Sequence, residues 1–247
     1  MIPKVIHYCW FGNNTKDEVV KKCIESWYKH CSDYEIIEWN ESNFNINENY
    51  FVKEAYKAKK WAFVSDYVRL KVLYEYGGVY CDADLEIIKN IDDLLRWGAF
   101  SGYQNINEIP TGIIGAVPQN KWIGYLLSYY NNRHFICDKG YDMRTNVSII
   151  TEMTKEKYNL FFDNRIEVFG DLCVLFPQDY LCAKNSRNGK IIITKNTYAI
   201  HHFNGSWVDR NVKFKLFVRK WLNRIFGEKV VEKFFVLKNT YFRKLIN

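Results

Sequence analysis

Residues 61–84 read WAFVSDYVRLKVLYEYGGVYCDAD, and this stretch decides the fold that we expect for the chain. Apolar side chains such as Tyr67 and Leu70 recur at helical spacing in its first part, and two glycines end the predicted helix. A short apolar run follows and ends in Asp82 and Asp84, which predicts a buried strand with two carboxylates at its end. The stretch therefore predicts a helix that passes through a glycine turn directly into a strand.

The segments on either side extend this alternation. Before it, apolar and aromatic runs predict strands at 4–11 and 34–40, and polar-apolar periodicity predicts helices at 15–31 and 50–60. Beyond it, we expect strands at 111–118 and 166–170, helices at 121–131 and 144–155, and a strand-rich segment at 190–203. Helices and strands in alternation predict an α/β fold with a Rossmann-like, mostly parallel sheet that is flanked by helices.

Composition indicates one large domain in a reducing compartment. A length of 247 residues with 48% hydrophobic and 26% charged residues suits a single α/β domain. Seven cysteines without a C-x-x-C pair predict free thiols. The N-terminal residues lack the pattern of a signal peptide, and no apolar run approaches the roughly 20 residues that span a bilayer. We therefore expect a cytoplasmic protein.

Charge separates a near-neutral body from a basic tail. The net charge is +7, and residues 210–247 hold eleven Lys or Arg against two Glu. We therefore place a domain boundary near residue 210, with a catalytic domain at 1–210 and a helical tail at 211–247. Apolar residues recur at helical spacing in this tail, opposite its basic side chains. The pattern fits a helical pair packed on the domain, and it fits equally a cationic amphipathic segment on an anionic membrane surface.

The two aspartates predict a cation site. Asp82 and Asp84 are at positions i and i+2, so in an extended strand both carboxylates project from one face. Hard oxygen ligands of this kind suit Mg²⁺ or Mn²⁺, although a solvated strand end would give the same pattern. Asp66 and Arg69 lie at i and i+3 on one face of the preceding helix, where they form either part of the same site or an intrahelical salt bridge.

These motifs resemble a known family of enzymes. The sequences SDYVRL at 65–70, GGVYCDAD at 77–84, IPKVIHYCWFG at 2–12 and AIHHFNGSW at 199–207 occur in the order and spacing of glycosyltransferase family 32. This family contains DXD-bearing sugar transferases and is related to the clostridial glucosylating toxins. The resemblance implies a GT-A fold, a nucleotide-sugar donor with UDP favoured, and Mn²⁺ or Mg²⁺ as cofactor. It covers residues 2 to about 105 and about 166 to 207.

The resemblance also implies roles for the matching residues. Trp10 would stack on the donor base. Asp66 and Arg69 would grip the donor sugar as catalytic residues. Asp82 would reach ribose, sugar or metal-bound water, and Asp84 would bind the metal directly.

The closing motif supplies the remaining site residues. His202, Ser206 and Trp207 match the segment that closes over the diphosphate and metal in the family. His201 and His202 would point in opposite directions along a strand, and His202 is the ligand that the H-F-N-G pattern favours. The family retains the donor's anomeric configuration. Front-face attack is the route we expect, and Asp66 is a weak candidate for a nucleophile.

Three functions fit these observations unequally. The leading hypothesis is transfer of a hexose or N-acetylhexosamine to a lipid-linked oligosaccharide, as in O-antigen or capsule synthesis, by a peripheral enzyme on the cytoplasmic face of the inner membrane. A toxin-type enzyme with a protein acceptor is the alternative. Nucleic-acid binding through the tail is disfavoured, because no nucleic-acid-binding module accompanies it. Acceptor specificity is expected from residues 120–165.

Overall fold

The structure, a computed structural model, describes two long segments and a few residues near the C-terminus. These are residues 1–138 and 140–205, together with 218, 219, 221–223, 225, 227, 230 and 231. Most of the basic tail that we place at 211–247 therefore lies outside the described residues.

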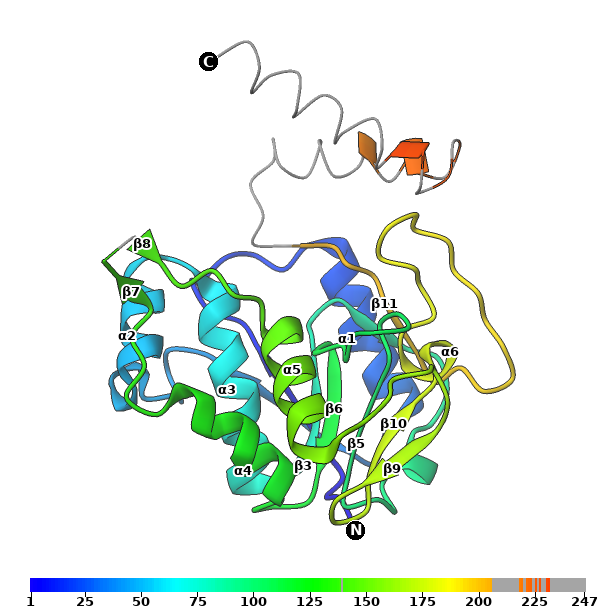
Figure 1. Ribbon diagram of the computed structural model, residues 1–247, viewed down its shortest axis with the longest axis horizontal. Helices are drawn as coiled ribbons and strands as arrows, with labels where there is room; N and C mark the ends of the chain where they lie inside the picture. Colours follow the sequence, from blue (N-terminus) through cyan, green and yellow to red (C-terminus); the bar gives the residue numbers. More distant parts are fainter. Residues whose placement is uncertain are drawn as a thin grey trace.

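A seven-stranded sheet in the order β2-β1-β3-β6-β5-β10-β9 forms the centre of the fold (Figure 1). The strands are β1 Val5–Cys9, β2 Glu35–Trp39, β3 Gly78–Cys81, β5 Ala99–Gly102, β6 Ile113–Ala116, β9 Glu167–Phe169 and β10 Cys173–Phe176. The pairs β2–β1, β1–β3 and β5–β10 are parallel, whereas β6 and β9 run antiparallel to their neighbours. The predicted α/β class, with a mostly parallel sheet, is confirmed.

Helices and a small second sheet cover the two faces of this sheet (Figure 1). The helices are α1 Glu18–His30, α2 Tyr50–Lys57, α3 Trp61–Tyr76, α4 Lys121–Leu127, α5 Asn146–Tyr158 and α6 Gln178–Leu181. The second sheet pairs β4 Leu85–Ile87 with β11 Ala199–His201, and a hairpin joins β7 Ile136–Cys137 to β8 Gly140–Tyr141.

Strand residues alternate between two hydrophobic cores. In β3, Tyr80 packs with residues of α2, α3, α4 and α5, whereas Val79 and Cys81 pack with residues of α1 and β4. This alternation follows from the two-residue repeat of an extended strand whose faces are both covered. It places α3 on one face of β3 and the β4–β11 sheet on the other.

The turn from α3 to β3 depends on its two glycines. Gly77 and Gly78 have φ of +68° and +96°, a region that residues with a Cβ rarely adopt. A Cβ at Gly78 would also lie 2.7 Å from the carbonyl oxygen of Val5. The glycine pair therefore fixes α3 rigidly against the start of β3.

The strand-rich prediction for 190–203 is only partly correct. Within it the structure has β11 and an isolated bridge between Lys184 and Ile191. Ile191, Ile192 and Ile193 are 42%, 54% and 60% exposed, so they belong to no core. β-Branched residues favour strands where neighbouring strands and a core cover them, and in this loop the pairing is limited to the single bridge between Lys184 and Ile191.

Two expected absences concern covalent links and membrane spans. All seven cysteines are free and six of them are buried. Across the residues that the structure describes, no helix combines the length and apolar character needed to cross a membrane.

Candidate functional site

A cavity of about 880 Å³ opens beside α3 and the end of β3. Its lining comes from separate parts of the chain: the loop after β1, the first half of α3, the β3–β4 turn, the start of α5 and the end of β11. The lining includes five of the site residues that the sequence predicts: Trp10, Asp66, Arg69, Asp82 and Asp84. The volume is that of a pocket for a sizeable small molecule. The predicted residues Ser206 and Trp207 lie outside the described residues.

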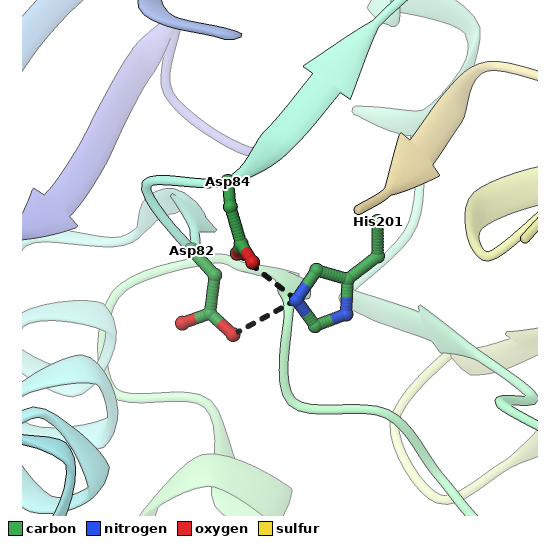
Figure 2. A group of neighbouring side chains, drawn as sticks. All are labelled: Asp82, Asp84 and His201. Atoms are coloured by element: carbon green, nitrogen blue, oxygen red, sulfur yellow. Dashed lines mark hydrogen bonds and ion pairs between the residues drawn. The ribbon is translucent and has the colours of Figure 1, made fainter. Parts of the chain in front are cut away.

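Asp82, Asp84 and His201 form a compact buried group (Figure 2). One potential ligand atom from each lies within 4.8 Å of the others. His201 Nε2 is 3.1 Å from Asp84 Oδ1 and 3.7 Å from Asp82 Oδ2. The aspartates converge through a turn rather than along an extended strand, because β3 ends at Cys81 and the backbone N–H of Leu85 donates to Asp82 O at 2.9 Å.

The structure places His201, and not His202, in this group. His201 pairs with Leu85 in the antiparallel β4–β11 register, which brings its ring beside Asp84. His202 Nε2 instead lies 2.8 Å from Glu86 Oε2. The two imidazoles therefore point to different partners, as expected for neighbouring strand residues. The sequence pattern favours His202 as the ligand, whereas the structure places the ring of His201 beside the aspartates, because one residue of register decides which ring faces them.

The charges of Asp84 and His201 stabilise each other in this buried environment. Burial opposes ionisation of Asp84, but the charge of His201 and hydrogen bonds from His201 and the Asn204 N–H outweigh it and lower the pKa to about 2. The Asn204 N–H donates to Asp84 Oδ2 at 2.6 Å. For His201, burial lowers the pKa, but Asp84 raises it well above the ordinary value. The pocket thus already balances a negative carboxylate against one positive charge.

This donor set fits a divalent cation. Two carboxylates and one imidazole are ligands that Mn²⁺ accepts and that suit Mg²⁺ less well at the nitrogen. The carboxylate of Asp84 is held ionised, as a ligand must be. A bound cation would take the place of the imidazolium charge, with His201 neutral.

Arg69 connects α3 to the aspartates. It is 4% exposed, and its Nη2 lies 3.0 Å from Asp66 Oδ1 while Nη1 lies 3.3 Å from Asp82 Oδ1. Nη1 also donates to the carbonyl oxygen of Thr111 at 2.6 Å. Burial acts to lower the pKa of Arg69, but the negative charges of Asp82 and Asp66 raise it above the ordinary value. The intrahelical salt bridge between Asp66 and Arg69 is present, and Arg69 also contacts Asp82 at the end of β3.

The pKa of Asp66 is raised towards neutral pH. Its side chain is almost fully buried, and burial raises its pKa from 3.8 to about 6 although the charge of Arg69 acts in the opposite direction. Near neutral pH it is mainly ionised but protonates readily. A carboxyl group of this kind can both accept and donate hydrogen bonds, which suits contact with hydroxyl groups.

Asn146 is a cavity residue that the sequence analysis missed. It is the first residue of α5 and is 3% exposed, and its Nδ2 donates to the backbone oxygen of Asp66 at 3.3 Å. Its Oδ1 is buried and has no hydrogen-bond partner among the described residues. An unsatisfied buried acceptor costs about 1–3 kcal/mol, so it marks a place where a bound molecule can donate. Capping by Thr145 predicts a helix start here, but not its position beside Asp66.

Trp10 lines the cavity from the end of β1. The indole is half-buried, and its Nε1–H donates to Asn14 O at 2.7 Å. Lys16 Nζ lies 5.4 Å from the centre of the ring. The ring is thus fixed at the cavity wall, and its role as a base platform stays a prediction.

Comparison with known protein families identifies the central region. Residues 17–101 match the model described as "Glycosyltransferase sugar-binding region containing DXD motif". Asp66, Arg69, Asp82 and Asp84 all lie in the matched region. The family resemblance predicted from the motifs is confirmed.

Characterised relatives extend the similarity beyond this region. Mannosyl phosphorylinositol ceramide synthase from Saccharomyces cerevisiae is 25% identical over 199 residues, which cover 75% of this chain and 50% of the yeast protein. Inositol phosphoceramide mannosyltransferase 2 from Schizosaccharomyces pombe is 24% identical over 261 aligned positions, which cover 100% of this chain and 70% of that protein. The chain therefore spans half the length of one relative and most of the other.

Solved structures of glycosyltransferases show partial similarity. The PaToxG glycosyltransferase has 17% identity and a TM-score of 0.46, covering 63% of this chain and 70% of its own. A glycosyltransferase involved in glycosylation of the major capsid of PBCV-1 has 11% identity and a TM-score of 0.44, covering 82% and 95%.

Proposed function

We propose that this chain, which carries the sugar-binding region of the DXD-containing glycosyltransferases, transfers a hexose or N-acetylhexosamine from a nucleotide-sugar and retains its anomeric configuration. The observation that carries the proposal is the convergence of Asp82, Asp84, His201 and Arg69 at one end of a single cavity. Cleavage of a sugar–phosphate bond places negative charge on the departing diphosphate, and this cluster is built to hold positive charge.

Asp84, Asp82 and His201 would hold Mn²⁺ or Mg²⁺. When bound, the ion supplies positive charge that stabilises the diphosphate leaving group. Arg69 adds a fixed guanidinium charge, because its contacts to Asp66, Asp82 and Thr111 O leave it little freedom to move. The residues predicted at Ser206 and Trp207 would close the site over the diphosphate.

Asp66 and Asn146 would position the donor sugar. Asp66 can accept from one hydroxyl and, when protonated, donate to another. Asn146 Oδ1, which has no partner in the described part of the chain, can accept from a neighbouring hydroxyl. Together they would hold the sugar ring between α3 and the start of α5, while Trp10 supports the base.

The arrangement favours front-face attack over a covalent intermediate. Among the described residues that line the cavity, the carboxylates are Asp17, Asp66, Asp82 and Asp84. Asp17 caps α1 and accepts from the Asn204 side chain, and Asp66 is paired with Arg69. No lining carboxylate in this set is both unpaired and separate from the proposed cation site. The departing phosphate would therefore take the acceptor's proton.

The acceptor that we propose is a lipid-linked oligosaccharide, as in O-antigen or capsule synthesis, used at the cytoplasmic face of the membrane. Two yeast relatives are named for mannose transfer to inositol phosphoceramide, which supports a lipid-borne acceptor in general terms. The same names make mannose a hexose to test, and a GDP-linked donor must stand beside the favoured UDP-linked one.

A thermal-shift screen tests the proposal directly. The full chain is heated with UDP- and GDP-sugars, each with and without Mn²⁺, and a rise in Tm that requires both donor and metal is expected. Asp84→Asn should remove this rise. Asp171→Asn, which alters an exposed surface acid paired with Lys121, is the matched control and should keep it. Failure of every nucleotide-sugar to shift the Tm in Mn²⁺ would overturn the proposal.

A further inference from the structure

The loop 184–198, which precedes β11, combines exposed isoleucines with positive charge. It contains Lys184, Arg187, Lys190 and Lys195 and no acidic residue. Ile191–Ile193 stand between two of these lysines, and all three side chains are exposed. Its first turn reaches the catalytic cavity, because Ser186 belongs to the cavity lining.

The backbone of this loop holds the isoleucines outward. The N–H of Ile192 donates to Ala183 O at 3.0 Å, and the N–H of Asn185 donates to Lys190 O at 2.8 Å. These bonds close a defined bend rather than a strand of the main sheet. Three consecutive exposed isoleucines in an ordered loop form an apolar patch that requires a partner, since such patches on soluble surfaces mark interaction sites.

Two lysines, Lys190 and Lys195, flank the patch. Lys190 and Lys195 form no ion pair with any residue in the described ranges. Lys89 adds a further positive charge at this edge, because its Nζ donates to Lys195 O at 2.9 Å. A partner for this surface must therefore be both apolar and negatively charged.

A second segment at the cavity also has exposed apolar side chains, with lysines of the α2–α3 connection beside them. Met143 is 55% exposed and lines the cavity, and Lys59 and Lys60 line it as well. Lys60 Nζ lies 6.0 Å from the ring of the exposed Tyr141. Figure 1 shows the β7–β8 hairpin at the upper left and the loop 184–198, in yellow, at the upper right. Apolar and cationic side chains thus border the cavity from two separate segments.

We propose that the loop 184–198 is a membrane-docking loop, with Ile191–Ile193 in the interfacial region of an anionic bilayer and with Lys190 and Lys195 against the lipid phosphates. The β7–β8 hairpin provides the second point of contact. An anionic bilayer offers apolar and negative partners together, which is the combination that amphipathic cationic segments bind. A second copy of this chain would bring like charges together.

The consequence for catalysis rests on the proposed function. Because Ser186 and Met143 both line the cavity, docking of this rim would present the cavity opening to the membrane plane. A lipid-borne acceptor could then reach the donor sugar without leaving the bilayer. The tail predicted at 211–247 meets this loop at one point, because Asn223 Nδ2 donates to Arg187 O at 3.0 Å.

Flotation of the full chain with lipid vesicles tests the docking loop. Wild-type protein should float with vesicles that contain phosphatidylglycerol and much less with pure phosphatidylcholine. Lys190→Gln with Lys195→Gln should weaken binding by about fivefold for each lysine. Ile192→Ser with Ile193→Ser should weaken it further without lowering the Tm, because these side chains pack in no core. Phe161→Ser, at an 85% exposed residue outside the cavity lining, should leave binding unchanged.

Donor hydrolysis in vesicle-free buffer separates this proposal from the proposed function. The loop variants should hydrolyse nucleotide-sugar at the wild-type rate while they lose vesicle binding. Unchanged flotation of both loop variants would overturn the docking loop, as would a solution dimer that Ile192→Ser dissociates. Vesicle binding by a protein that binds no nucleotide-sugar would overturn the proposed function and leave the docking loop standing.

Discussion

The guanidinium of Arg69 in α3 lies 3.3 Å from the carboxylate of Asp82, the first residue after β3. This contact links a helix on one face of the sheet to the turn that carries Asp82 and Asp84. It exists because Gly77 and Gly78 reverse the chain so sharply that α3 packs beside the strand that follows it. One continuous segment therefore supplies both halves of the charge cluster.

Removing the Arg69 side chain should destabilise the protein, because Arg69 is the counter-charge of two buried carboxylates. Arg69→Met leaves Asp66 and Asp82 buried without their counter-charge, and the loss of one partner from a buried pair costs about 3–5 kcal/mol. Adding Asp66→Asn removes one of the stranded charges and should restore part of that stability, while donor hydrolysis stays lost. Urea unfolding of the two single variants and the double variant measures the coupling. If the changes in unfolding free energy of the two single variants simply added up in the double variant, the predicted coupling between Arg69 and Asp66 would be contradicted.

The substitution Asp66→Asn should change stability in a pH-dependent way. The pKa of Asp66 is raised by burial from 3.8 to about 6, so the folded protein binds this proton more tightly than the unfolded chain. The resulting stability is fully present below pH 4 and is lost as pH rises through 6. Relative to wild type, Asp66→Asn should gain on the order of 3 kcal/mol between pH 4 and pH 7.5. A pH-independent difference in unfolding free energy would contradict this.

Asp84→Asn should abolish metal-dependent donor hydrolysis and leave a folded protein. The amide removes one anionic ligand, and removal of a key electrostatic group in an active site typically costs about 100-fold or more in rate. In the metal-free protein this variant should also unfold more easily, because His201 and the Asn204 N–H lose an anionic partner. Normal hydrolysis in Mn²⁺ would refute the metal assignment.

A pair of adjacent histidine variants separates the structure-based assignment from the sequence-based one. His201→Ala should raise the Mn²⁺ concentration that half-saturates donor hydrolysis by about 10-fold or more, because the His201 ring faces Asp82 and Asp84. His202→Ala should leave the half-saturating Mn²⁺ concentration unchanged, because the His202 ring contacts Glu86. The half-saturating Mn²⁺ concentration is the measurement. The reverse result would support the choice made from the motif.

His201 and His202 differ in a way that the tertiary fold, and not the local sequence, determines. Period-two alternation predicts that the two rings diverge, and it does so correctly. Which ring faces the aspartates depends on the register between β4 and β11, which the chain sets through contacts between residues more than a hundred positions apart. No local pattern contains that information.

Local signals performed better where a segment determines its own structure. The helix at 61–76 and the glycine turn after it are specified by spacing and by the φ angles that only glycine adopts readily. Asp66 and Arg69 were therefore placed correctly on one face. Asn146 was missed because its importance arises only when α5 packs against α3. The β propensity of the isoleucines at 191–193 predicts a strand, yet their pairing is limited to one isolated bridge between Ile191 and Lys184.

His7 should give the fold a second pH dependence, opposite to that of Asp66. The Trp39 Nε1–H donates to His7 Nδ1 at 3.1 Å, so the proton of the neutral ring is on Nε2, which donates to Gly77 O at 2.8 Å. Burial lowers the pKa of His7 from 6.5 to about 4. The stability that follows is present above pH 6.5 and is lost as pH falls towards 4.

The contributions of His7 and Asp66 to the pH dependence of the unfolding free energy nearly cancel in the wild-type protein between pH 4 and 6. A separate variant of each residue is therefore needed to reveal its contribution. His7→Gln keeps a donor for Gly77 O but does not titrate. Whatever its stability at pH 7.5, it should gain on the order of 3 kcal/mol relative to wild type as pH falls to 4. In Asp66→Asn the remaining His7 term should instead make stability fall over the same range. If the unfolding free energy of each variant differed from that of wild type by a constant amount across this pH range, neither group would titrate with the shifted pKa.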